Sequence, residues 1–125
     1  MITILVIEDE DAVREMLRAT LEHNGFRVLA ANGGQEALRL CESEPAPVDV
    51  LLTDVVMPGT SGTDLAGYFA VRYPEMRVVR MSGFTEAMLG EAGLVREESL
   101  FLQKPFSRKH LLETIRRALG ESAVE

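Results

Sequence analysis

Polar side chains that could bind a cation or a phosphoryl group stand directly after four short apolar segments: Glu8 and Asp9, Asp54, Ser82, and Lys104. Apolar runs of this length, bounded by turn residues, are typical of buried strands. Because the carboxyl ends of parallel strands meet at one edge of a sheet, we expect these side chains to lie together. Neighbouring carboxylates repel each other, and a divalent cation relieves that repulsion. Oxygen ligands with few carboxylates favour Mg2+.

Asp54 is the candidate nucleophile of this group. A carboxylate can attack phosphorus and form an acyl phosphate, while a cation neutralises the phosphoryl oxygens. Lys104 could pair with a further oxygen as a compact point charge, and the Ser82 hydroxyl could donate to another. Each residue also has a plainer interpretation, as a turn residue or surface lysine, and the acidic run 8–11 could simply begin a helix. The combination favours phosphoryl chemistry.

Five apolar segments alternate with five amphipathic ones, which predicts crossover connections and a parallel α/β sheet. The predicted strands are 2–7, 26–31, 48–54, 76–81 and 99–103. The predicted helices are 12–24, one capped by Asn32 and running to about Ser43, one from Thr60 to just before Pro74, one from about Thr85, and one from the Ser107 cap to Gly120. We therefore predict one domain, 1–120, with a C-terminal tail, 121–125.

Three local features qualify this prediction. Gly90 and Gly93 weaken the fourth helix, because each costs roughly 1 kcal/mol relative to alanine. Cys41 shares the apolar face of the second helix and is predicted to lie in the core. The Lys104–Pro105 bond is left open: a cis form is one alternative, whereas the general preference of such bonds favours the trans form.

The composition excludes several classes of protein. The chain has 125 residues and a formal net charge of −7, which argues against direct binding to nucleic acid. A single cysteine excludes an internal disulfide and agrees with a reducing compartment. No apolar run approaches the ~20 residues that span a bilayer, and the short apolar start lacks the basic flank of a signal peptide. We expect a cytoplasmic protein without membrane insertion.

Four motifs resemble those of the two-component response-regulator receiver domain, in order and across essentially the whole chain. They are Val6 to Glu10 (VIEDE), Leu52 to Gly59 (LTDVVMPG), Met81 to Gly83 (MSG) and Gln103 to Phe106 (QKPF). The resemblance implies a flavodoxin-like, doubly wound, five-stranded parallel sheet of order 2-1-3-4-5 with five helices.

The resemblance also implies roles for the candidate site residues. Asp54 would accept phosphate from the phosphohistidine of a histidine kinase or histidine phosphotransfer protein. Ser82 and Lys104 would contact the phosphoryl group, and Phe101 would be the switch aromatic, although core packing is its plainer interpretation. The implied Mg2+ ligands are Glu8, Asp9, Asp54 and the main-chain carbonyl of Val56.

The implied function is a phosphorylation-dependent switch that changes the surface of the fourth helix, fifth strand and fifth helix. The first helix would be the docking site of the phosphodonor. The protein would catalyse its own phosphoryl transfer and a slow autodephosphorylation. A weak homodimer is left open, as is the choice between a stand-alone protein and a domain of a larger chain.

Some positions depart from the commonest family pattern. Glu8 stands where many members have Asp, Ser82 where Thr is frequent, and Phe101 where Tyr is frequent. The segments 81–84 and 101–106 look most like receivers of hybrid sensor histidine kinases.

Two other functions remain as alternatives. A metal-dependent aspartyl-phosphate phosphohydrolase would want a second Asp where Val56 stands, and it would need a cap domain. A degenerate receiver would act as an interaction module without phosphorylation, but the complete set of acids, hydroxyl and lysine argues against it.

Overall fold

The computed structural model describes residues 1–44, 47–55, 67–69, 71–83, 88 and 100–120. Its strands are β1 (Thr3–Ile7), β2 (Arg27–Ala31), β3 (Val50–Asp54), β4 (Arg77–Ser82) and β5 (Leu100–Gln103). Its helices are α1 (Asp11–His23), α2 (Gly34–Ser43) and α5 (Arg108–Ala118). The five strands form one parallel sheet of order β2-β1-β3-β4-β5, which confirms the predicted fold.

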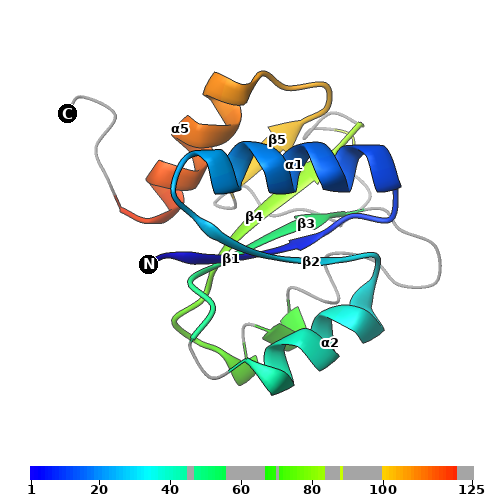
Figure 1. Ribbon diagram of the computed structural model, residues 1–125, viewed down its shortest axis with the longest axis vertical. Helices are drawn as coiled ribbons and strands as arrows, with labels where there is room; N and C mark the ends of the chain where they lie inside the picture. The colour runs from blue at the N-terminus through cyan, green and yellow to red at the C-terminus, as the bar shows by residue number, and fades with distance from the viewer. Residues whose placement is uncertain (45–46, 56–66, 70, 84–87, 89–99, 121–125) are drawn as a thin grey trace.

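The sheet is covered on both faces, with α1 and α5 on one side and α2 on the other (Figure 1). Strand side chains alternate between two core clusters: Ile4 and Val6 pack toward α1 and α5, whereas Leu5 and Ile7 pack toward α2. Every residue of β1 and β3 is buried. Their mainly apolar sequences follow from burial on both faces. In the part of the chain that is described, no helix is long and apolar enough to span a bilayer.

The two remaining predicted helices lie largely outside the described residues. The backbone is helical at 67–69 and 71–72, within the predicted third helix. Phe69 of this segment is fully buried in the α2-side cluster. Within the predicted fourth helix, Met88 is described and has a helical backbone, whereas Gly90 and Gly93 lie outside the described residues.

The predicted Ser107 cap and the predicted glycine ends of two helices are confirmed. The Ser107 hydroxyl accepts a hydrogen bond from the His110 N–H at 3.0 Å, which confirms the predicted cap of α5. Gly25 and Gly120 follow α1 and α5 with φ values of 91° and 86°, the left-handed conformation that ends helices.

The predicted Asn32 cap of α2 is wrong. Gly33 is the N-cap residue, and no side chain accepts a capping hydrogen bond there. Asn32 instead donates its main-chain N–H to Glu36 Oε1 at 2.8 Å. The carboxylate from the first turn thus reaches back to the chain before the helix, as in one half of a capping box. The helix therefore begins at Gly34, one residue later than a cap at Asn32 would place it.

Cys41 is buried against the α2-side core, as predicted. Burial raises the pKa of its thiol above the ordinary value of 9.0, and Glu44 and Glu42 add to that effect. Only the thiolate reacts with iodoacetamide, and each unit of increase in pKa lowers the thiolate fraction about tenfold. We therefore expect alkylation near pH 8 to be slower than for free cysteine. The alkylation rate of Cys41 should keep rising with pH after the alkylation rate of free cysteine has become constant.

The chain unfolded in urea is the control for this measurement, because its exposed thiol should react at the ordinary rate. Equal rates for the folded and unfolded chains would contradict the buried position of Cys41.

Candidate functional site

Lys104 joins two acids that lie 96 and 50 residues away in the sequence. Its ammonium donates to Asp54 Oδ2 at 2.8 Å and also to Glu8 Oε1. The Glu8 side chain is 1% exposed, that of Asp54 8%, and that of Lys104 21%. Three of the residues predicted from the sequence therefore meet at the carboxyl edge of the sheet, largely shielded from solvent.

The sheet fixes where these side chains begin. Asp54 is the last residue of β3, and Glu8 follows β1, with its N–H donating to the Ala31 carbonyl at 3.0 Å. The Lys104 N–H donates to the Ser82 carbonyl at 2.7 Å and extends the pairing of β4 with β5. The Lys104–Pro105 bond is cis. The trans preference of such bonds is only about 0.5–1 kcal/mol, so the surrounding fold can override it.

Asp9 completes an acidic group at this edge. One carboxylate oxygen from each of Glu8, Asp9 and Asp54 lies within 4.8 Å of the others. Glu8 and Asp54 are buried, whereas Asp9 is exposed, so the group opens to solvent on the Asp9 side. Carboxylate oxygens at this spacing suit a small hard divalent cation that keeps some of its water. Val56, whose carbonyl is a predicted ligand, lies outside the described residues.

Burial and pairing act in opposite directions on the two partners at the base of the site. Burial raises the pKa of Glu8, and hydrogen bonds from Lys104 and the Glu10 N–H only partly offset this. Burial alone would lower the pKa of Lys104, but its hydrogen bonds to Asp54 and Glu8 outweigh burial and raise it. The pKa of Lys104 is raised because its ammonium has two carboxylate partners. The pKa of Glu8 is also raised, because Glu8 shares the Lys104 ammonium with Asp54 and the shared charge does not offset burial. Additional positive charge would therefore be favourable here.

The two predicted switch residues lie on adjacent strands. Ser82 is buried at the end of β4, beside Gln103 of β5. Phe101 is half-buried in β5, and it belongs to neither of the core clusters formed by the described residues.

Sequence reasoning missed one residue at this edge, Arg14 of α1. Its Nη1 donates to the Glu8 main-chain carbonyl at 2.9 Å, and its Nη2 lies 2.5 Å from Asp11 Oδ1. The spacing of Asp11 and Arg14 along the helix favours their ion pair. No sequence signal points to the bond from Arg14 to a carbonyl six residues earlier.

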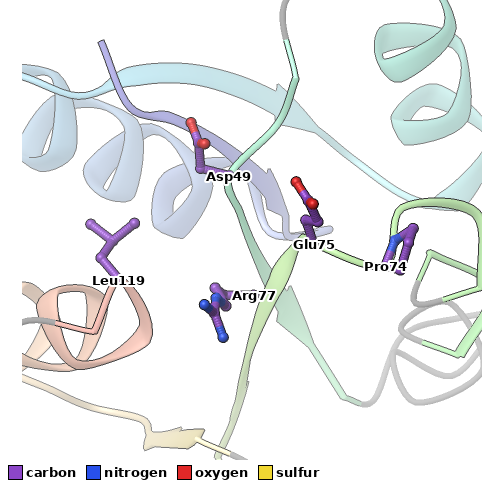
Figure 2. A pocket seen from close by; sticks show the side chains of 5 residues that line it. All are labelled: Asp49, Pro74, Glu75, Arg77 and Leu119. Carbon is purple, nitrogen blue, oxygen red and sulfur yellow. The ribbon is translucent and has the colours of Figure 1, made fainter.

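A cavity of about 470 Å³ lies at the opposite edge of the sheet. Figure 2 shows the side chains around it, which are Asp49, Pro74, Glu75, Arg77 and Leu119. Asp49 Oδ2 accepts a hydrogen bond from the Thr3 N–H at 2.8 Å, so this carboxylate holds β1 against the start of β3. The cavity shares no residue with the acidic group.

Comparison with known proteins gives one family over most of the chain. The family model for the response regulator receiver domain matches residues 4–116. Sensor kinase CckA of Brucella abortus is 35% identical over 117 residues, which cover 94% of this chain and 12% of that protein. Transcriptional regulatory protein FixJ of Azorhizobium caulinodans is 35% identical over 118 residues, or 94% of this chain and 55% of that protein. The chain thus spans only part of these relatives.

Solved structures agree with this comparison. The receiver domain of the hybrid histidine kinase CckA has a TM-score of 0.78 and 33% identity, covering 94% of this chain and 98% of that one. It matches the predicted likeness to receivers of hybrid kinases, although FixJ is equally close in sequence. Response regulator TrrA of Thermotoga maritima, solved with Mg2+-BeF, has a TM-score of 0.79 and 25% identity, covering 94% of this chain and 99% of that one.

Proposed function

Because this chain belongs to the response regulator receiver domain family, we propose that it is a phosphorylation-dependent switch of a two-component phosphorelay. Receiver domains are phosphorylated by histidine kinases. In this proposal Asp54 accepts the phosphoryl group from a phosphohistidine of a kinase or a phosphotransfer protein. The observation that carries it is the position of Lys104 between the buried carboxylates of Glu8 and Asp54, with Asp9 at the open side.

The proposed Mg2+ ligands are Glu8, Asp9, Asp54 and the Val56 carbonyl. The spacing of the three carboxylates supports this set, as does the solved Mg2+-BeF complex of the related TrrA. When bound, the ion would neutralise charge on the phosphoryl oxygens. Hard oxygen donors and an exposed side that admits water favour Mg2+ over softer metals.

In the proposed transfer, a carboxylate oxygen of Asp54 attacks the phosphorus of the phosphohistidine. The bond from phosphorus to the imidazole nitrogen breaks, and its electron pair leaves with the imidazole. Lys104 and Ser82 would hold phosphoryl oxygens and orient them. Hydrolysis of the acyl phosphate by water would later return the free Asp54 carboxylate and inorganic phosphate, so the signal would be transient.

The proposed readout of this charge is the surface around β5 and α5. A phosphoryl group adds roughly −2 charge at the end of β3 and would draw Lys104 and Ser82 toward it. Ser82 ends β4, and Phe101 lies on the neighbouring strand β5. A shift of Ser82 would leave space that the half-buried Phe101 ring could enter. The proposed switch unit is the whole receiver, residues 1–120.

The direct test is labelling by acetyl phosphate in the presence of Mg2+. The intact mass should rise by one phosphoryl group in the parent protein, and the label should be lost in hydroxylamine, which cleaves acyl phosphates. We expect Asp54→Asn, or removal of Mg2+ with EDTA, to abolish labelling.

Asp49→Asn is the matched control for this test. It removes an aspartate next to the same strand, while its amide oxygen can still accept the Thr3 N–H bond. This variant should label like the parent. Equal labelling of Asp54→Asn and the parent would overturn the assignment of Asp54. An unlabelled parent that still binds its partner would favour the degenerate receiver, and turnover of phosphomonoesters would favour the phosphohydrolase.

A further inference from the structure

We propose that Arg14 is a positioning residue that fixes the peptide between Glu8 and Asp9 and thereby sets the affinity of the site for Mg2+. This inference rests on the proposed function, because it concerns the same acidic group. Arg14 itself would contact neither the cation nor the phosphoryl group.

The first support is the direction of the Arg14 side chain. Arg14 lies in the first turns of α1, which begins where β1 ends (Figure 1). Its guanidinium turns back to the Glu8 carbonyl at 2.9 Å, and its other nitrogen lies 2.5 Å from Asp11 Oδ1. The Arg14 side chain is 22% exposed, whereas that of Asp11 is 90% exposed. The guanidinium is therefore held against the loop rather than extended into solvent.

The second support is the Glu8–Asp9 peptide, which the Arg14 hydrogen bond fixes. Glu8 and Asp9 are consecutive, yet Glu8 points inward to Lys104 and Asp9 lies exposed. The peptide that joins them decides whether both carboxylates can face one ion. Its carbonyl is the group that accepts the Arg14 hydrogen bond. On the other side of Glu8, the sheet already fixes the main chain through the bond from the Glu8 N–H to Ala31.

The third support is the charge balance. Lys104 donates to the carboxylates of Glu8 and Asp54, which also belong to the acidic group. Arg14 donates to a main-chain carbonyl and to Asp11, neither of which belongs to the acidic group. Because Asp11 balances its charge, Arg14 adds little repulsion toward a cation. Its effect on Mg2+ is therefore mainly geometric, through the position of Asp9.

If Arg14 served only the stability of the fold, Arg14→Met would weaken Mg2+ binding only through a loss of folded protein. The Arg14–Asp11 pair is a surface ion pair, and such pairs contribute little to stability. Its loss should leave folding nearly unchanged, whereas loss of the carbonyl contact should free the Glu8–Asp9 peptide. Metal affinity and folding stability therefore separate the two interpretations.

The test is a calorimetric titration of the metal-free protein with Mg2+ alone, together with thermal unfolding of each variant. We expect Arg14→Met to weaken Mg2+ binding about tenfold, at the lower end of the effect of removing a group that orients metal ligands. Arg14→Lys should recover part of the affinity, because one ammonium can still reach the carbonyl. Asp11→Asn should weaken Mg2+ binding much less than Arg14→Met, since it only removes the charge that balances Arg14 while the contact to Glu8 remains.

Arg18→Met is the matched control. Arg18 lies one turn further along α1, pairs with Glu15 and Glu22, and carries the same charge. It should bind Mg2+ like the parent. The proposal is overturned if Arg14→Met binds Mg2+ like the parent, if Arg18→Met weakens binding equally, or if the loss in Arg14→Met only follows a loss of folded protein. If the parent binds no Mg2+, both the metal-dependent function and this inference are overturned. If the parent is labelled and binds Mg2+, and Arg14→Met binds Mg2+ equally well, this inference alone is overturned.

Discussion

Replacing Lys104 with Met should lower the free energy of unfolding by about 3 kcal/mol in magnesium-free buffer. Lys104 is the cation shared by the buried carboxylates of Glu8 and Asp54. Methionine keeps most of the apolar stem but removes the ammonium from between two negative groups. Urea unfolding at neutral pH measures the loss, and millimolar Mg2+ should recover most of it, because a divalent cation supplies the missing positive charge.

Lys109→Met is the control for this prediction. Lys109 is exposed in the first turn of α5, so its replacement removes one positive charge without touching the site. Its effect should stay within about 0.5 kcal/mol, as for other surface changes. If Lys104→Met were as stable as the parent without Mg2+, the buried pairing would contribute no net stability. If Mg2+ stabilised the parent and Lys104→Met equally, the ion and the ammonium would not serve the same carboxylates.

The fold was predictable because each strand is marked in the sequence by its own residues. In the segment Val50–Asp54, three consecutive apolar residues precede Thr53 and Asp54, and burial on both faces explains this apolar run. The strand order could not be obtained from spacing alone. It came from the resemblance carried by the four motifs, and the observed order β2-β1-β3-β4-β5 agrees with it.

The site was only partly predictable, because sequence position gives the edge of the sheet but not the partner of each side chain. Parallel strands bring Glu8, Asp54 and Lys104 to one edge, and this much followed from their positions at the ends of the predicted strands. The sequence suggested that Lys104 serves a phosphoryl oxygen, whereas in this structure its ammonium contacts Glu8 and Asp54. Contacts that depend on how far a long side chain reaches, such as that of Arg14 to the Glu8 carbonyl, have no sequence signal.

Glu8→Gln should make the protein more stable while weakening its binding of Mg2+. Burial raises the pKa of Glu8, so holding this residue as a carboxylate at neutral pH costs stability. Glutamine removes that cost, and Lys104 keeps Asp54 as its partner. We expect a gain in the free energy of unfolding at neutral pH, measured by urea unfolding, because a group whose pKa is raised by folding loses stability above that pKa. Binding of Mg2+ should fall about a hundredfold, at the upper end of effects around metal sites, because one of three negative charges is lost.

Glu8→Asp is the control, since it keeps the charge and removes one methylene. A shorter carboxylate at this position should reach Lys104 less well but remain available to a cation, so Mg2+ binding should persist. Loss of binding in Glu8→Asp as well would mean that the length of Glu8, and not its charge, is what the cation requires. A decrease in stability of Glu8→Gln would show that the Glu8–Lys104 pair outweighs the cost of burying Glu8. If both effects have the expected sign, the buried Glu8 carboxylate lowers the stability of the metal-free protein and also attracts the cation. Binding of Mg2+ would then offset the cost of burying that charge, so the ion would stabilise the fold.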